Sequence, residues 1–259
     1  MGGVHSGDVD YSKQYLTFVA LENGTFTFTP KNSNVISYST DGGKTWTQGN
    51  SVAVNSGDKV MWKGTMAPST SSTYGIGTFS STGNFDVQGN VMSLLFEDNF
   101  KGQISLTGKN YAFYQLFYQN TKVINAENLS LPATTLASNC YNQMLRGCTS
   151  LTTAPELPAE TLTSGCYGGM FNGCSSLTIA PVLSATTLKS TCYNNMFNGC
   201  SNLNYIKAMF TTTPSTTYTQ KWVNGVAATG TFVKNSAAQW NVTGNSGVPS
   251  GWTVQTASE

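Results

Sequence analysis

The apolar positions in the second half of the chain recur with a fixed period of 26 residues. Four columns repeat across three segments, and they consist of Cys140, Cys166 and Cys192, of Met144, Met170 and Met196, of Cys148, Cys174 and Cys200, and of Leu151, Leu177 and Leu203. A fixed period of this length is typical of repeat proteins, in which each unit buries its apolar face against the next. We therefore expect these segments to stack.

A degenerate copy precedes the three regular ones. In this copy the repeated positions are occupied by Ala112, Leu116, Asn120, Val123 and Leu131. Its cysteines are absent, as is common in a terminal unit. The predicted repeat region therefore covers residues 101–210.

Within one unit the spacing of apolar residues changes. Cys140 with Met144, and Tyr141 with Leu145, recur at i and i+4, which predicts one apolar stripe on a short helix. Gly147 follows where such a helix would end. The segment 151–157 is short, rich in β-branched residues and interrupted by proline, so it is predicted to be extended. Each unit is thus expected to be a 26-residue coil of strand and short helix.

The residues upstream of the repeats have the pattern of antiparallel strands. Short alternating or β-branched runs occur at 15–20, 25–30, 35–39, 59–63, 75–79 and 91–96, separated by Asn-Gly, Asp-Gly-Gly and Ser-Gly-Asp turns. We expect a β-sandwich-like domain over residues 11–100, with the last run opening the repeat stack. Residues 1–10 are predicted to be a flexible tail.

The residues downstream are rich in glycine and threonine and contain three tryptophans. Runs at 218–234 and 240–254 carry Trp222, Trp240 and Trp252 and are predicted to be β-hairpins. Because a short repeat array needs both ends covered, residues 211–259 are expected to form a C-terminal β-hairpin cap. The fold class is therefore mixed and mainly β, with a sandwich-like domain, a repeat region and a cap.

The repeat also carries a family resemblance. The pattern Cys-Tyr-x-x-Met-Phe-x-Gly-Cys-Ser/Thr-x-Leu-x-x-Ala-Pro-x-Leu resembles the BspA-like leucine-rich repeats of surface proteins from gut Bacteroides and similar bacteria, and from their phages. The resemblance covers about residues 110–210. It implies a right-handed solenoid with a parallel strand face and a non-enzymatic role in binding or adhesion.

Composition excludes several classes of function. Only 10% of the residues are charged, the net charge is +1, and Arg146 is the only arginine. Without a basic surface the chain is not expected to bind nucleic acid. The longest apolar runs are far shorter than a membrane span, so no transmembrane segment is predicted. The exterior is expected to consist of hydroxyl and amide groups.

Catalytic groups are scarce. The single histidine, His5, lies in a Gly/Ser-rich tail, so an imidazole base or metal ligand is not expected. Glu97, Asp98 and Asp86 could hold calcium, but their spacing matches no ligand loop and solvated turn acids are favoured. We predict no enzyme activity, no cofactor and no metal.

The six cysteines allow three interpretations: a metal site, disulfides or core packing. Zinc sites favour close Cys pairs, whereas here the spacing within a unit is eight residues. Inward-facing columns of small apolar thiols are the favoured interpretation. A disulfide within each coil, of the Cys140 to Cys148 type, remains the alternative.

One turn motif stands out in the first domain. Ser39, Asp41, Gly43, Thr45 and Trp46 match the Asp-box, which occurs several times over in sialidase propellers. A single copy cannot build a propeller, and one arginine cannot supply the arginine triad of a sialidase. The motif is therefore predicted to be a structural hairpin turn, in which the carboxylate accepts hydrogen bonds from the turn.

The aromatic residues fall into two groups. Tyr141, Tyr167, Tyr193, Phe171 and Phe197 follow the repeat and are predicted to stack between coils. Tyr111, Phe113, Tyr114, Phe117 and Tyr118 crowd the first unit, where they either pack against the upstream domain or are exposed for binding. The candidate binding surface consists of Tyr111, Tyr114, Tyr118, Thr152 and Thr178.

Two functions follow from these observations. The first is a surface-exposed interaction or adhesion protein that binds a protein or glycan on a host or microbial surface. It would be extracellular or at the cell surface, although no export signal is visible in the chain. The alternative is a structural or receptor-binding component of a phage virion or phage-like particle. The oligomeric state is left open.

Overall fold

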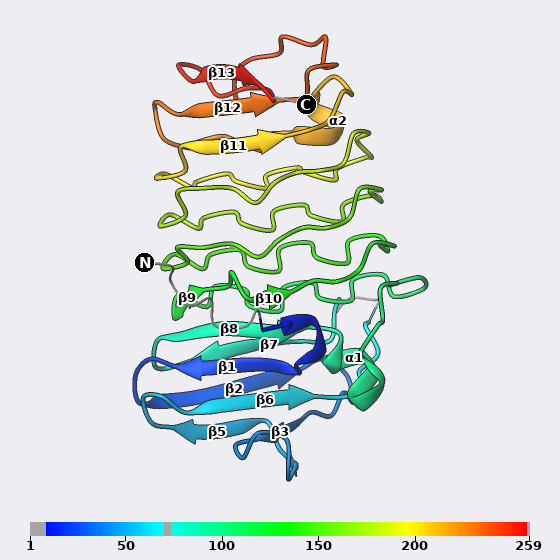
Figure 1. Ribbon diagram of the computed structural model, residues 1–259, viewed down its shortest axis with the longest axis vertical. Helices are drawn as coiled ribbons and strands as arrows, with labels where there is room; N and C mark the ends of the chain where they lie inside the picture. Colours follow the sequence, from blue (N-terminus) through cyan, green and yellow to red (C-terminus); the bar gives the residue numbers. More distant parts are fainter. Residues whose placement is uncertain (1–8, 70–73, 258–259) are drawn as a thin grey trace, which may run out of the picture.

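The computed structural model describes residues 9–69 and 74–257. It is elongated, with a layered β domain at one end and a stack of chain segments that rises from it to the C-terminal strands (Figure 1). The first eight residues, which include His5 and most of the predicted flexible tail, lie outside the described part. The fold is mainly β, with several sheets and only short helices.

The larger sheet lies in the N-terminal domain. Its strands are Leu16–Ala20 (β1), Ser37–Ser39 (β3), Thr47–Gln48 (β4), Lys59–Lys63 (β6), Phe85–Asn90 (β8), Val123–Asn125 (β9) and Leu129–Ser130 (β10). The order is β10-β8-β1-β6-β3-β4, and β9 also pairs with β8. The pairs among β1, β3, β4, β6 and β8 are antiparallel, as the sequence predicts.

The second sheet consists of Gly24–Pro30 (β2), Ser51–Val54 (β5) and Gly77–Ser81 (β7) in the antiparallel order β5-β2-β7. Rings from the two sheets meet in the core. Phe18 of β1 lies 5.3 Å from Phe26 and 4.8 Å from Phe79, measured between ring centroids. Five of the six predicted strand runs overlap a strand. The strands β4, β5 and β8 were not predicted.

The sixth predicted strand, residues 91–96, is wrong. The chain turns after β8 and forms the short helix Ser93–Phe96 (α1), followed by the 3-10 turn Glu97–Asn99 (η2). The Ser93 hydroxyl fixes this helix beneath the sheet, since it accepts from Leu16 N and donates to the Trp62 carbonyl. The run is apolar because nearly all of it is buried, and such a run does not distinguish strand from helix.

The first repeat unit attaches to both sheets of the N-terminal domain. On one side β9 and β10 pair in parallel with β8. On the other side Phe79 N in β7 donates to the carbonyl of Leu116, and Asn120 Nδ2 donates to the carbonyl of Phe79. Asn120, which replaces the second cysteine of the repeat, thus serves as an attachment point. The two sides of the stacked units continue the two sheets.

The predicted short helix of each unit is wrong. Residues 111–120, 139–148, 165–174 and 191–200 form runs of consecutive turns, which we call the turn ribbon, and no helix occurs among residues 101–210. Successive backbone N–H groups alternate between an acceptor in the same unit and one in the next unit. The N–H of Asn142 donates to the carbonyl of Asn139, three residues earlier, whereas the N–H of Gln143 donates to the carbonyl of Gly168 in the next unit. The ribbon thus combines local turns with hydrogen bonds between units.

A four-residue period explains the ribbon. Every fourth residue has a positive φ, as at Asn139 (55°), Gln143 (56°) and Gly147 (77°). Two buried residues then alternate with two that face solvent. Over eight residues this pattern is nearly indistinguishable from the 3.6-residue period of a helix, which is why the i, i+4 spacing misled.

The other side of each unit is extended, as predicted for residues 151–157. Thr152 N donates to the Ile124 carbonyl, and isolated parallel bridges join Asn125 to Thr153 and Ile179 to Tyr205. Between the two sides lies the core of the stack. All twelve Cys, Met and Leu residues of the four columns are fully buried there.

The predicted aromatic ladder is confirmed. Tyr141, Tyr167 and Tyr193 stack in one column, with centroids 5.7 Å and 6.2 Å apart, and Phe113 precedes them at 5.6 Å. Phe171 and Phe197 form a second column at 5.7 Å. Flat rings at this spacing join units that are otherwise linked by backbone hydrogen bonds.

The C-terminal residues continue the stack, and the predicted hairpin cap is wrong. Tyr205–Ala208 (β11), Thr231–Lys234 (β12) and Thr253–Thr256 (β13) pair in parallel. Tyr205 of β11 pairs with Thr231 of β12, which follows it by one 26-residue repeat. Gly225 likewise follows Gly199 by one repeat, and its φ of 73° is close to the 77° of Gly199. Trp222 occupies the methionine column of this extra unit, which also contains the short helix Thr216–Thr219 (α2).

Candidate functional site

A hollow of about 320 Å³ opens on the turn ribbon in the middle of the stack. It is lined by Asn142, Gln143, Arg146, Gly168, Gly169, Asn172, Thr191, Asn194, Asn195 and Asn198. These residues come from three successive units. We call this hollow the amide groove.

The groove exists because one unit has two glycines where its neighbours have amides. Gly168 aligns with Asn142 and Asn194, and Gly169 aligns with Gln143 and Asn195. At Gly168 the glycine allows close approach, since a Cβ there would lie 2.7 Å from Asn142 Nδ2. At Gly169 a Cβ would meet Gln143 Cγ at 3.2 Å and no other described atom within 4 Å, so the missing side chain leaves a notch one unit wide.

Hydrogen bonds fix part of the amide lining. Asn142 Nδ2 donates to Asn139 Oδ1 and to the Gly165 carbonyl, both at 3.2 Å. Asn194 Oδ1 accepts from Gln220 N at 2.8 Å, and Asn198 Oδ1 accepts from Asn224 Nδ2 at 2.9 Å. These bonds orient the amides without consuming all their donors and acceptors.

Several polar atoms remain available to a ligand. Within residues 9–69 and 74–257, the side-chain amide of Asn172 makes no hydrogen bond, and neither does Asn142 Oδ1 or Asn195 Nδ2. An amide offers both two donors and an acceptor with two lone pairs. The groove therefore presents donors and acceptors side by side, and no carboxylate lines it.

Tyrosines flank the groove on the side of the first unit. The Arg146 guanidinium lies 5.7 Å from the centroid of the Tyr118 ring. Tyr111 stacks on Tyr74 at 4.2 Å, and Tyr114 meets both at an angle. All three predicted tyrosines are half-buried, and burial raises the pKa of Tyr114.

The crowded aromatic segment thus divides between the two predicted roles. Phe113 and Phe117 are fully buried, and Phe117 lies 5.7 Å from both Phe18 and Phe79 of the N-terminal domain. Phe117 thus serves the junction, whereas Phe113 belongs to the aromatic column of the stack. Tyr111, Tyr114 and Tyr118 keep part of their rings at the surface.

The structure does not join the predicted threonines to these tyrosines. Thr152 and Thr178 are exposed and line a separate hollow of about 260 Å³ together with Ala154, Ile179 and Pro181. This hollow shares no lining residue with the amide groove. The candidate surface therefore separates into a tyrosine part and a threonine part.

Sequence reasoning missed the groove itself. Its floor, Gly168 and Gly169, is visible in the repeat alignment as the one place where two adjacent amide positions are both glycine. A search of the repeat alignment for positions that depart from the repeat would have identified the groove. Arg146 was noted only as evidence against a basic surface.

The cysteines are buried free thiols, as favoured by the sequence. No disulfide joins any of the six. Cys148, Cys174 and Cys200 donate from Sγ to backbone carbonyls of the preceding unit at 3.0 to 3.2 Å. Burial raises the pKa of Cys140 to about 12 and that of Cys192 to about 11, so all six are poor nucleophiles.

The Asp-box residues form a hairpin turn between β3 and β4. Asp41 Oδ1 accepts from Ser39 Oγ at 2.7 Å and from Thr45 N at 2.9 Å, and Ser39 Oγ accepts from Gly43 N at 2.9 Å. These bonds hold the pKa of the Asp41 carboxyl well below its usual value. Trp46 packs against Tyr15 at 4.8 Å. The predicted structural role accounts for every residue of the motif.

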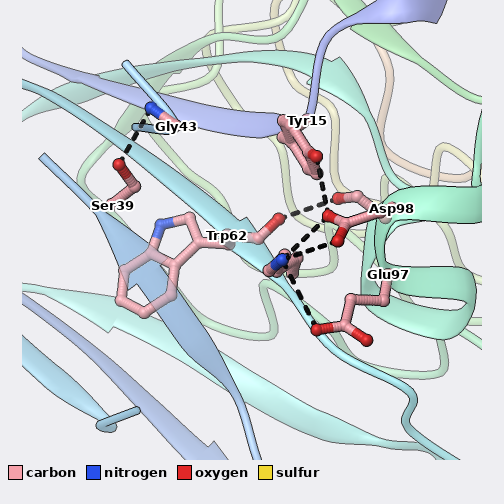
Figure 2. A network of polar contacts seen from close by, with 8 residues as sticks. Tyr15, Ser39, Gly43, Trp62, Glu97 and Asp98 are labelled. Atoms are coloured by element: carbon pink, nitrogen blue, oxygen red, sulfur yellow. Dashed lines mark hydrogen bonds and ion pairs between the residues drawn. The ribbon is translucent and has the colours of Figure 1, made fainter. Parts of the chain in front are cut away.

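A polar network lies next to this turn. Tyr15, Glu97 and Asp98 converge in Figure 2. Lys63 Nζ lies 2.8 Å from Asp98 Oδ1 and 3.4 Å from Glu97 Oε1. Lys63 also lies 4.4 Å from the centroid of the Trp46 ring. Burial and the bond to Asp98 raise the pKa of Tyr15 to about 12. The network ties the turn to η2.

The predicted alternative of a calcium site gains no geometric support. Glu97 and Asp98 pair with Lys63, whereas burial raises the pKa of Asp86, which lies in β8. Within the described ranges, His, Cys, Asp and Glu side chains form no group of three that could hold a metal ion. None of the helices in these ranges has the length and apolar character of a membrane span.

Comparison with known proteins adds no relative. No protein-family model, curated protein or solved structure matches this chain.

Proposed function

We propose that this chain is a non-enzymatic interaction protein that binds a saccharide in the amide groove. The observation that carries the proposal is the notch at Gly168 and Gly169, lined by amides that keep free donors and acceptors. Sugars present vicinal hydroxyls that both donate and accept, and amide side chains match them on both counts. A protein or a glycan would fit the sequence; the groove favours the glycan.

The size and borders of the groove fit the same ligand. Small-molecule sites usually enclose about 300–1,000 Å³, and the groove lies at the lower end of that range. Tyr118 at its border is half-buried and keeps part of its ring at the surface, against which the apolar face of a sugar can pack.

The proposed fold context is a short solenoid of the leucine-rich-repeat type. It is supported by the 26-residue advance of the hydrogen bonds and by the stacked columns of Cys, Met, Leu and aromatic residues. The turn ribbon replaces the short helix predicted from the spacing of apolar residues. With the BspA-like resemblance, the proposed location is a bacterial cell surface.

The proposal is tested by screening the folded protein on a glycan array and then titrating each hit in solution. Gly169→Asn should abolish binding, because it fills the notch with the side chain that the neighbouring unit carries. Asparagine tolerates the φ of 60° at this position. Gly108→Asn is the matched control, since Gly108 has a φ of 74° and open space around it.

Unchanged binding by Gly169→Asn would show that the ligand binds outside the groove. If the folded protein binds no saccharide on the array, saccharide binding is refuted altogether. Circular dichroism and thermal unfolding of both variants establish that each is folded.

A second candidate is a receptor-binding component of a phage particle. The elongated shape favours it, because the N-terminal domain lies at one end and the stack extends away from it (Figure 1). The amide groove opens on that stack. Such a protein could be held by its first domain and present the groove outward. Mass spectrometry of purified particles from a producing strain would detect the chain under this candidate and not under the first.

A further inference from the structure

We propose that the amide groove selects saccharides that carry an anionic group, a carboxylate or a sulfate ester, and that Arg146 binds that group. This inference rests on the proposed saccharide binding and names its ligand class. It concerns the one charged side chain that lines the groove.

The Arg146 guanidinium is oriented but not neutralised. Its Nη1 donates to Gln143 Oε1 at 3.2 Å, and the same oxygen accepts from Gln115 Nε2 at 3.1 Å. Arg146 forms no ion pair with a carboxylate in the described part of the chain. A guanidinium has five N–H donors, so most of its fork is free for a planar anion.

The acidic residues of the repeat region are separated from its turn-ribbon side. Residues 109–122, 137–149, 163–176, 189–202 and 215–226 hold the turn ribbon and its counterpart in the extra unit; they contain no Asp or Glu, and their cations are Lys109, Lys122, Arg146, Lys189 and Lys221. Lys207, in β11, lies on the other side. The acids of the region, Glu127, Glu156 and Glu160, lie in the segments between. Glu127 and Glu156 line a different hollow.

This separation matters because the net charge of the whole chain is only +1. A nearly neutral protein presents one side that carries cations alone, with the amide groove on it. An anion in the groove would meet no negative charge on the ribbon. A single charge-assisted pair on a fixed guanidinium strengthens binding and adds selectivity.

Titration calorimetry with ligand pairs that differ in one group tests the inference. Trigalacturonic acid is compared with its methyl ester, 3′-sulfolactose with lactose, and 3′-sialyllactose with the methyl ester of its sialic acid carboxylate. We expect at least one anionic member to bind about tenfold or more tightly than its neutral partner, as a hydrogen-bonded charge pair provides. The pairs distinguish a carboxylate from a sulfate.

Two variants assign the preference to Arg146. Arg146→Gln should make the affinities for the anionic and neutral members of a pair equal, because it removes the charge while glutamine keeps a donor for Gln143 Oε1. Lys101→Gln removes one exposed cation outside the groove and should change neither affinity. Arg146→Lys, which keeps the charge without the fork, should retain part of the preference.

The outcomes separate the two proposals. Equal affinity for the neutral and anionic members in the unmodified protein refutes the anionic preference and leaves saccharide binding standing. A preference that persists in Arg146→Gln refutes the role of Arg146. Absence of binding to every saccharide on the array and in these titrations refutes both proposals.

Discussion

The rings of Tyr141 and Tyr167 lie 5.7 Å apart and are within 5° of parallel, although 26 residues separate them in the chain. The same side chain at the same position of successive units produces this stacking. Phe113 and Tyr193 extend the column on either side. One consequence is that the Tyr141 hydroxyl is enclosed by the stack, where it has no hydrogen-bond partner among the described residues.

Tyr141→Phe should therefore stabilise the protein. The substitution removes a buried hydroxyl that lost its water on folding, and it keeps a ring of the type that Phe113 already contributes to the column. Recovery of this desolvation cost predicts a gain of about 1 kcal/mol in the free energy of unfolding. Urea unfolding of the two proteins measures it, and a loss of stability would show that the hydroxyl has a partner inside the stack.

Thr191→Gly should also stabilise the protein. Thr191 has a φ of 56°, a left-handed conformation that is strained for a β-branched residue. Relief of roughly 1–2 kcal/mol is partly offset by the greater backbone entropy of glycine in the unfolded chain, so a net gain of about 0.5–1 kcal/mol is expected. Thr187→Gly, in an extended segment bridged to Thr161, should instead destabilise.

The parts of the fold that repeat were accessible from the sequence. Fixed columns such as Cys140, Cys166 and Cys192 identify the buried positions without any knowledge of the backbone. Alternation and turn residues likewise identify the antiparallel strands β1, β2 and β6. In both cases many residues support the same assignment, so the tertiary contacts of any single residue do not overturn it.

The predictions that failed concern features that depend on backbone conformation or on residues that depart from the repeat at single positions. Periods of four and 3.6 residues diverge by less than one position over Cys140 to Cys148, so the turn ribbon resembled a helix. The extra unit was not predicted, because Trp222 and Val226 replace the repeated methionine and the second repeated cysteine. The amide groove is produced by two missing side chains, at Gly168 and Gly169, which a search for functional residue types does not detect.

Asp41→Ala should loosen the Asp-box hairpin and lower the midpoint of thermal unfolding by a few degrees. It removes the acceptor for the backbone N–H groups of Lys44 and Thr45 and for the Thr45 hydroxyl. Hydrogen exchange of those two amides should accelerate, and the fluorescence of Trp46 should shift. Lys44→Ala is the control, because the Lys44 side chain makes no hydrogen bond or ion pair with the described residues, and it should leave both signals unchanged.

Acidification should destabilise the same turn. The folded pKa of Asp41 lies below its unfolded value near 3.8, so the carboxylate stabilises the hairpin above that pH. This contribution is lost as the pH falls below about 3.8. The difference in stability between the unmodified protein and Asp41→Ala should therefore shrink on acidification; a difference that stays constant from pH 7 to pH 2 would contradict the role of the charge.

The six thiols predict the response to alkali. Their unfolded pKa is near 9.0, whereas burial raises the folded pKa of Cys140 and Cys200 to about 12 and that of Cys192 to about 11. Between these values the unfolded chain has lost protons that the folded chain retains, so each thiol lowers the stability as the pH rises from 9. For Cys140, Cys192 and Cys200 this contribution is complete below pH 9 and lost by about pH 11 to 12.

Measurement of unfolding by urea from pH 7 to pH 10.5 should thus show a decline that begins near pH 9. Cys192→Ala should reduce its slope, because one titrating group is removed. Native protein at pH 8 should react with a thiol reagent only as fast as it unfolds, and all six thiols should react in denaturant. Rapid labelling of even one thiol in the folded protein would show that the column to which it belongs is open to solvent.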